Sequence, residues 1–145
     1  MTRVRFYHNA ADPLALACEL VGRAYGSGRR IAIRTADPAS ARRLDAMLWT
    51  FDARAFIPHV LADSPLGAET PVRIASVGHE PDWHDDEMLF NLAADEPAHP
   101  ERFRMVVEIV GQSESDKLPA RLRWQRYKAA GFDLQAFDAV RREAL

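Results

Sequence analysis

The stretch VRFYHNAADPLALACELVGRAYGSGRRIAIRT, residues 4–35, decides the fold class. Val4–His8 is rich in aromatic and branched side chains, which is typical of a strand. Asp12 and Pro13 then predict a helix start, because a carboxylate caps the first free amides and proline fits the first helical position. Apolar residues recur at helical spacing over the next turns, and Ile31–Thr35 predicts a second strand. This strand–helix–strand order predicts an α/β domain with parallel strands.

The same order continues through the rest of the chain. Asp37 and Pro38 repeat the start of a helix that we expect to run to about Trp49. Later apolar runs predict three further strands, at Pro71–Val77, Met88–Leu92 and Met105–Val110. We expect residues 50–70 to be irregular and residues 134–142 to form a last short helix. The expected fold is α/β: a three-layer, mostly parallel sheet with helices on both faces, Rossmann-like without a nucleotide site, in a single domain of residues 1–145.

Bulk composition narrows the classes of function. Of the 145 residues, 48% are hydrophobic, which is enough for a full core. The net charge is −2, which predicts no general affinity for nucleic acid. The single cysteine, Cys18, excludes an internal disulfide and a cysteine-based zinc site. No stretch is long and apolar enough to span a membrane or to act as a signal peptide, so we expect a soluble, cytoplasmic protein. The charge is uneven, since residues 80–96 are acidic and residues 117–128 are basic.

Motifs for catalysis and cofactor binding are missing. GSGRR (Gly26–Arg30) lies between a helix and a strand, the wrong side for a phosphate cradle, and it has the spacing of neither known phosphate loop. His79, His84 and Asp85 share a polar loop that could hold a metal, although such residues are more often solvated. No serine lies in a nucleophile-elbow context. We therefore expect no metal, no cofactor and no catalytic set.

The segment LPARLRWQRYKAAGFDL (Leu118–Leu134) predicts one basic helix. We expect Asp116 to cap its N-terminus, Pro119 to lie in its first turn and Gly131 to end it at the C′ position. Five cations and no acid occupy residues 117–132: Lys117, Arg121, Arg123, Arg126 and Lys128.

Two sides of this helix are apolar. Leu118, Leu122 and Ala129 share one stripe, which we expect to face the core. Trp124 and Tyr127 lie on roughly the opposite side, among the cations. A helix with one buried face does not need a second aromatic face. Either the protein covers both sides, so that both rings belong to the core, or the second face receives an anionic ligand with an apolar part.

A second cluster of bulky rings lies in LWTFDARAFIPHVLA, residues 48–62. It contains Trp49, Phe51, Phe56 and Ile57 in a mostly irregular stretch interrupted by proline. These side chains either anchor a loop to the core or form an exposed apolar patch that binds another protein. The composition leaves both interpretations open.

Several segments together resemble the chi subunit of bacterial DNA polymerase III, and they cover nearly the whole chain in the family's order. They are FYH (6–8), AYGSGRRIAI (24–33), RRLDAMLWTFDARAFIPH (42–59), the NL of residues 91–92, and ARLRWQRYKAAGFDL (120–134). The most specific parts are LDAMLW followed by FIPH, and RWQRYKAAGF.

The resemblance implies a non-catalytic accessory subunit of the DNA polymerase III holoenzyme, in the clamp-loader complex, that acts in DNA replication. It implies two partners: the psi subunit, and the C-terminal tail of single-stranded DNA-binding protein, which is acidic and ends in a phenylalanine with a free carboxylate. DNA would then be bound only indirectly. The residues carried over to the psi interface are Trp49 and Phe56, with Phe51 and Ile57 in the same cluster. The residues carried over to the tail site are Arg123, Tyr127 and Lys128, with Arg121 and Trp124 as neighbours and Phe132 as a wall.

Two rival functions remain open from the sequence. One is a direct nucleic-acid-binding module that uses the basic C-terminal helix, with an affinity that falls steeply with salt. The other is a nucleotide-binding α/β enzyme, against which the missing phosphate loop argues. A site for the tail differs from both because it would require the terminal phenylalanine.

Overall fold

Eight strands of the described residues form one sheet, in the order β3-β4-β2-β5-β6-β1-β7-β8. All neighbouring pairs are parallel except β7 and β8. The structure is a computed structural model that describes residues 2–52, 54, 56–83 and 87–145. The strands are β1 (Arg3–Ala10), β2 (Ile31–Thr35), β3 (His59–Leu61), β4 (Val72–Ser76), β5 (Met88–Asn91), β6 (Met105–Gly111), β7 (Asp133–Asp138) and β8 (Glu143–Ala144). The helices are α1 (Pro13–Gly26), α2 (Pro38–Thr50) and α3 (Glu114–Ala129), with short 3-10 helices η1 (Gly67–Glu69) and η2 (Pro100–Arg102).

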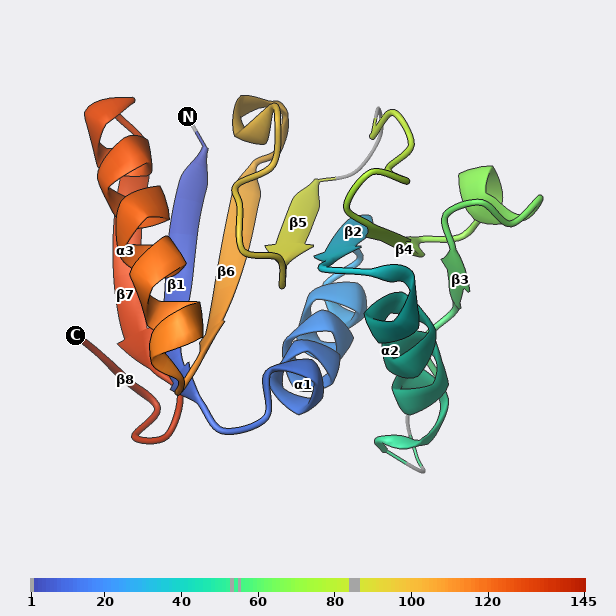
Figure 1. Ribbon diagram of the computed structural model, residues 1–145. Coiled ribbons are helices and arrows are strands. Elements are labelled where there is room, and N and C mark those ends of the chain that lie inside the picture. Colours follow the sequence, from blue (N-terminus) through green and yellow to red (C-terminus); the bar gives the residue numbers. More distant parts are fainter. Residues whose placement is uncertain (1, 53, 55, 84–86) are drawn as a thin grey trace.

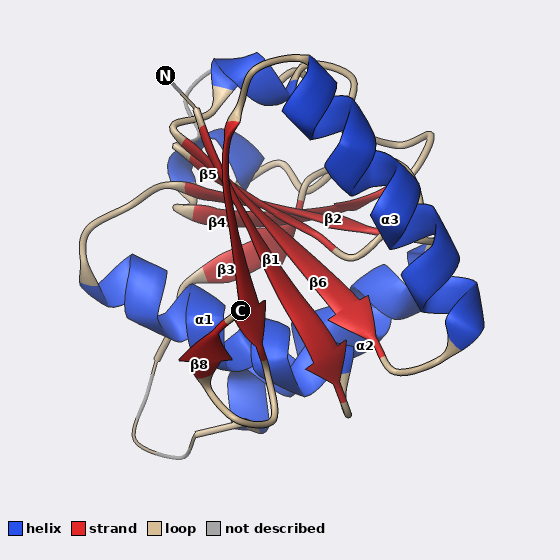
Figure 2. Cartoon of the chain, turned by 90° about the vertical axis from the view of Figure 1, so that its left-hand side faces the viewer, coloured by secondary structure: helices blue, strands red, loops and turns tan. Residues whose placement is uncertain are grey.

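Helices cover both faces of the sheet, as predicted. Helices α1 and α2 lie on one face and α3 lies on the other (Figures 1 and 2). Successive strand residues point to opposite faces. Ile31 and Ile33 accordingly pack in the core under α1 and α2, whereas Ala32 between them packs in the core under α3. None of the helices in the described part of the chain combines the length and apolar character needed to cross a membrane.

The five predicted strands and the first two helices are confirmed. Asp12 and Asp37 cap α1 and α2 through their carboxylates, and a proline follows each cap. Cys18 is buried in α1. Burial raises the pKa of its thiol to about 11, so it remains protonated and packs as a small apolar residue.

Two expectations about local structure were wrong. Residues 134–142 do not form a helix, because Asp133–Asp138 is a strand that pairs with β1. Pairing with β1 satisfies the backbone groups of an otherwise open strand edge, and this outweighs a weak helical pattern. Residues 50–70 are also less irregular than expected, since they contain β3 and η1.

The ends of α3 differ in how well the sequence predicted them. Ser113 rather than Asp116 is the N-cap, and its hydroxyl accepts a hydrogen bond from the Asp116 amide. Pro119 therefore lies inside the helix, not in its first turn. Gly131 ends the helix as predicted, with φ of 87°. The Phe132 amide donates to the Tyr127 carbonyl and the Gly131 amide to the Lys128 carbonyl, which is the Schellman arrangement.

Candidate functional site

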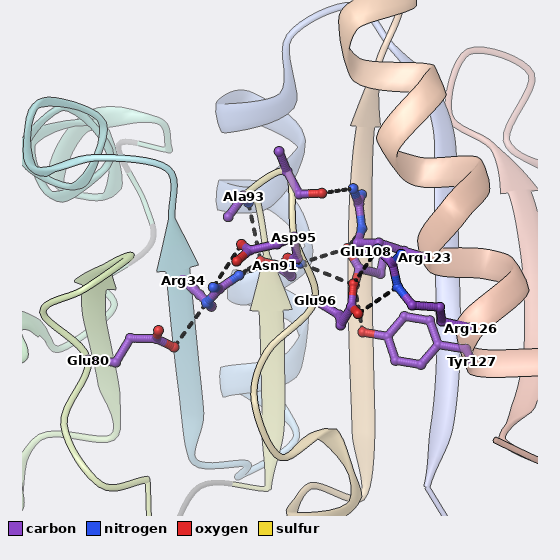
Figure 3. A network of polar contacts seen from close by, with 11 residues as sticks. Arg34, Glu80, Asn91, Ala93, Asp95, Glu96, Glu108, Arg123, Arg126 and Tyr127 are labelled. Carbon is purple, nitrogen blue, oxygen red and sulfur yellow. Dashed lines mark hydrogen bonds and ion pairs between the residues drawn. The ribbon is translucent and has the colours of Figure 1, made fainter.

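A buried polar network joins α3 to the sheet, and Glu108 of β6 is its centre (Figure 3). The Glu108 carboxylate is fully buried and accepts hydrogen bonds from Arg123 Nε at 3.1 Å, Tyr127 Oη at 2.7 Å and Asn91 Nδ2 at 2.9 Å. Burial raises the pKa of this carboxyl group, and the nearby Arg123 guanidinium acts in the opposite direction. Burial raises the pKa of Tyr127, and the Glu108 carboxylate raises it further, so the phenol remains protonated and donates.

The network continues across the sheet to β2. Arg34 donates to Asn91 Oδ1 and forms ion pairs with Glu80 at 3.0 Å and Asp95 at 2.8 Å. Acids of the 80–96 segment thus bind cations of the sheet. Glu96 of the same segment pairs with Arg126 of α3. The acidic segment and the basic helix are therefore in contact.

The buried face of α3 is not the one that we predicted. Leu118 and Leu122 are 55% and 53% exposed, and Ala129 is also exposed. The residues that face the sheet are Ala120, Arg123 and Tyr127. The stripe of Leu118, Leu122 and Ala129 was expected to face the core because helical periodicity considers only which side chains are apolar. The sheet beneath offers a carboxylate, which a guanidinium and a phenol can satisfy and a leucine cannot.

The six residues carried over to the tail site fall into three groups. Arg123 is 2% exposed and Tyr127 is 2% exposed, and both are engaged by Glu108. Arg121 and Lys128 are exposed. The rings of Trp124 and Phe132 are half-buried and pack against the core on this face: Trp124 meets Phe6 edge-on, and Phe132 meets Tyr127 edge-on. A ligand on the surface can therefore contact Arg121, Lys128, Trp124 and Phe132, but not the buried Arg123 and Tyr127.

A cationic pocket of about 390 Å³ lies where α3 passes the ends of β1 and β7. Its lining comprises His8 and Asn9 of β1, Lys117 and Arg121 of α3, and Asp138 of β7. At 3.6 residues per turn, Lys117, Arg121, Trp124 and Lys128 form one stripe along the flank of α3. We call this set the flank stripe. All four members can be picked out in the sequence of the basic helix. Their partners from β1 and β7 cannot, because their approach depends on the tertiary fold.

His8 contributes a titratable group to this pocket. Burial lowers the pKa of its imidazole below the ordinary value of 6.5, and the Arg123 guanidinium acts in the same direction, while Asp138 opposes them. The ring also stacks on Phe6. His8 is therefore neutral at neutral pH, and the charge of the pocket comes from Lys117 and Arg121 against Asp138.

The second predicted cluster is mostly exposed. Trp49 is 51% exposed and Phe56 is 68% exposed, and their rings lie 5.7 Å apart. Phe51 is 37% exposed, whereas Ile57 is buried in the core beside α1. We call Trp49, Phe51 and Phe56 the aromatic patch. Ile57 thus anchors the segment to the core and the three rings are exposed, whereas their binding of another protein stays a prediction.

Two further kinds of site were considered from the sequence and judged unfavourable, a metal site and a phosphate loop. Within the described residues, no three His, Cys, Asp or Glu side chains are grouped so that they could hold a metal ion. His84 and Asp85, which we considered with His79 as metal ligands, lie outside the described residues. The loop Gly26–Arg30 leads into the start of β2, opposite the edge at which the parallel strands end.

Comparison with known proteins identifies the family. The family model described as DNA polymerase III chi subunit, HolC, matches residues 1–135. The chain belongs to the DNA polymerase III chi subunit family. It is 37% identical over 139 residues to DNA polymerase III subunit chi of Pseudomonas aeruginosa, with 93% of this chain and 95% of that protein covered. It is 34% identical over 119 residues to subunit chi of Escherichia coli K12, with 82% and 80% covered.

Membership of the chi family places the chain in DNA polymerase III and in DNA replication.

Solved structures add information on the fold alone. The C-terminal domain of the DEAD-box protein Dbp5 superposes with a TM-score of 0.61 at 14% identity, covering 94% of this chain and 90% of that one. S. cerevisiae Dbp5 bound to RNA and ADP BeF3 gives 0.62 at 12% identity, covering 94% of this chain and 41% of that one. The predicted Rossmann-like class is confirmed.

Proposed function

We propose that this chi-family chain is a non-catalytic adaptor that holds the psi subunit at the aromatic patch and the C-terminal tail of single-stranded DNA-binding protein at the flank stripe. It would act in the clamp-loader complex and connect the polymerase to coated single-stranded DNA through two protein contacts. The observation that carries the proposal is the cationic pocket on the same flank of α3 as Trp124, because this combination matches an acidic tail with a terminal aromatic residue.

The flank stripe supports the tail site on chemical grounds. The tail offers a free carboxylate next to a phenyl ring. Arg121 can bind a carboxylate with two parallel hydrogen bonds, and Lys117 adds a positive charge in the same pocket. The half-buried indole of Trp124, two turns along the stripe from Lys117, gives the phenyl ring an aromatic surface. Phe132 and Lys128 lie at the far end of α3, where preceding acids of the tail can reach Lys128.

Arg123 and Tyr127 have a different role in this proposal. Glu108 engages both side chains beneath the surface of α3. They hold the helix on the sheet and thereby position Arg121 and Trp124. Contact with the tail therefore rests on Arg121, Lys117, Trp124 and Lys128.

The aromatic patch supports a psi interface because exposed, neighbouring rings are typical interface anchors. Trp49 also packs against His59, with ring centroids 4.4 Å apart, so the indole is held in place before a partner arrives. A rigid anchor loses little conformational entropy on binding. Ile57 contributes by fixing the segment to the core.

Titration of the protein with an acidic peptide that ends in proline–phenylalanine tests the tail site. We expect Arg121→Ala to weaken binding by about tenfold, since one charge-assisted contact is lost. Arg43→Ala, on the exposed surface of α2, is the matched control and should bind as the wild type does. Equal binding by Arg121→Ala and the wild type would remove the flank stripe from the proposal.

The rival use of α3 as a nucleic-acid-binding helix has weaker support. Two of the five cations counted in this segment are paired with acids, Arg123 with Glu108 and Arg126 with Glu96. The remaining cations form a short stripe rather than a long track for phosphates.

A further inference from the structure

A second cleft, of about 290 Å³, opens on the other face of the sheet. It lies between the last turns of α1 and the parts of β5, β6 and β1 that α1 leaves uncovered. Its floor is apolar, with Met88, Phe90, Met105 and Val107. Its rim carries three arginines, Arg5, Arg23 and Arg29, and none of its described lining residues is acidic. We call it the arginine cleft.

Among the described charged residues that line the arginine cleft and their ion-pair partners, positive charge exceeds negative charge, although the whole chain is acidic. Glu19 is shared by Arg23 at 3.0 Å and Arg142 at 2.7 Å. Glu87 is likewise shared by Arg29 and Arg104. Each shared carboxylate leaves one positive charge in excess.

Arg5 adds a third positive charge, because its Nε donates to the neutral amide oxygen of Gln135. Among the described cleft arginines and their ion-pair partners, three positive charges are therefore in excess, in a protein whose net charge is −2. This part of the surface therefore attracts anions.

An aromatic pair borders the same cleft. Tyr7 of β1 lines it and stacks on Phe137 of β7, with ring centroids 5.2 Å apart and planes at 20°. The Arg5 guanidinium lies 5.8 Å from the centroid of the Phe137 ring. A site for single-stranded nucleic acid usually combines cations that contact the phosphates with aromatic rings on which the bases stack. Arginine suits it further, since it binds phosphate with two hydrogen bonds and stacks on flat rings.

We propose that the arginine cleft binds single-stranded DNA, with phosphates on Arg5, Arg23 and Arg29 and a base against Tyr7 and the apolar floor. This contact is separate from both protein sites. The flank stripe lies on α3, which covers the other face of the sheet (Figures 1 and 2). The aromatic patch lies at the C-terminal end of α2, where Phe51 is close to Gly22 of α1. DNA released locally by its binding protein would then pass over the adaptor itself. The family resemblance implies only indirect contact with DNA, and the arginine cleft adds a direct, weak contact.

Fluorescence anisotropy with a labelled oligothymidine of about 15 nucleotides tests the proposal on the full-length protein. Three phosphate contacts predict a log–log salt slope of about −2, since a single strand contributes about −0.7 per contact. We expect the double variant Arg5→Ala, Arg29→Ala to bind about tenfold more weakly, with a slope of about −0.7. We expect Tyr7→Leu to weaken binding of the oligothymidine but not of an abasic strand of the same length, because only the former has bases to stack.

Controls separate this contact from the proposed tail site. Arg43→Ala should leave DNA binding unchanged, and Arg5→Ala, Arg29→Ala should bind the tail peptide as the wild type does, which also shows that the variant is folded. Three outcomes would overturn the proposal. They are no binding at low salt, loss of binding in Arg121→Ala but not in the double variant, and equally tight binding of a polyglutamate peptide through the same arginines, which would make the cleft a peptide site.

Discussion

At the scale of single residues, Glu108 decides which side of α3 faces the sheet. A carboxylate in the middle of the apolar strand MVVEIV must be satisfied by donors from the covering helix, and α3 supplies Arg123 and Tyr127. The two partners are therefore tied to stability, while Arg121, two residues away and exposed, is free to bind a ligand.

Arg123→Ala and Arg121→Ala should separate these roles. Removal of the Arg123 guanidinium leaves Glu108 buried without its counter-charge, which we expect to lower the free energy of unfolding by about 3 kcal/mol. Arg121→Ala should change it by less than about 0.5 kcal/mol, because the side chain is exposed. Urea unfolding of both variants measures this. An Arg123→Ala variant as stable as the wild type would contradict the role given to the buried pair.

His8 predicts a pH dependence of tail binding. Its pKa is lowered by burial and by Arg123, so the free protein carries a neutral imidazole at pH 7. A bound anion favours the charged imidazole, which raises this pKa in the complex, so binding takes up a proton. Affinity for the tail peptide should therefore increase as the pH falls from about 7 to about 5, where the peptide acids remain charged.

Calorimetry at several pH values measures the effect, with His8→Gln as the control that cannot titrate. Folding stability should change with pH in the opposite direction to tail affinity: it should decrease as the pH falls. A histidine whose pKa is lowered on folding disfavours the folded state as the pH falls below its unfolded value of 6.5. Unchanged affinity over this pH range in the wild type would place the peptide away from His8.

At the scale of elements, local signals predicted the early helices well and α3 only in part. The caps of α1 and α2 and the Schellman end of α3 depend on residues that are neighbours in sequence, so the local sequence is enough to predict them. The buried face of α3 depends on Glu108, which comes from another element. A charged residue at an inward position of an apolar strand was the available signal, and Arg34 in IAIRT is a second example.

The exposed leucines of α3 give a test of this inverted face. Leu122→Glu should change the free energy of unfolding by less than about 0.5 kcal/mol, because the side chain is half in solvent and packs on no core cluster. Ala120→Glu should unfold or strongly destabilise the protein, since Ala120 is 1% exposed against the sheet. Thermal unfolding monitored by circular dichroism compares the two. If Leu122→Glu destabilised the protein more than Ala120→Glu, the leucine stripe and not the Ala120 side would be the buried face of α3.

The 48–62 segment divides in the same way. Phe56→Ala should weaken psi binding with little change in stability, because the ring is 68% exposed. Ile57→Ala should cost about 2–4 kcal/mol, as expected for a core side chain truncated to alanine. Pull-down with psi and urea unfolding give the two readouts. Loss of stability in Phe56→Ala would mean that the ring anchors the loop.

At the scale of the whole molecule, the two proposed protein-binding sites, the aromatic patch and the flank stripe, lie on opposite faces of the sheet. Helix α2 packs over β2, β3 and β4 at one end, and α3 packs over β6 and β7 at the other (Figure 1). This separation allows one molecule to hold both protein partners at once, which increases the effective concentration of each near the other. The parallel direction of the strands was predictable from the repeated strand–helix pattern, but their order in the sheet was not. The pairing of β7 with β1, and hence the cationic pocket between β1, α3 and β7, was not.

The most direct test of the central claim is a calorimetric titration with an acidic peptide ending in proline–phenylalanine, compared with the same peptide amidated at its C-terminus. We expect the free acid to bind in a salt-sensitive way to the wild type and to Arg43→Ala. We expect amidation and Arg121→Ala each to weaken binding by about tenfold. Equal binding of the acid and the amide would show that the flank stripe is a general cationic surface, and would contradict a pocket that reads the terminal carboxylate.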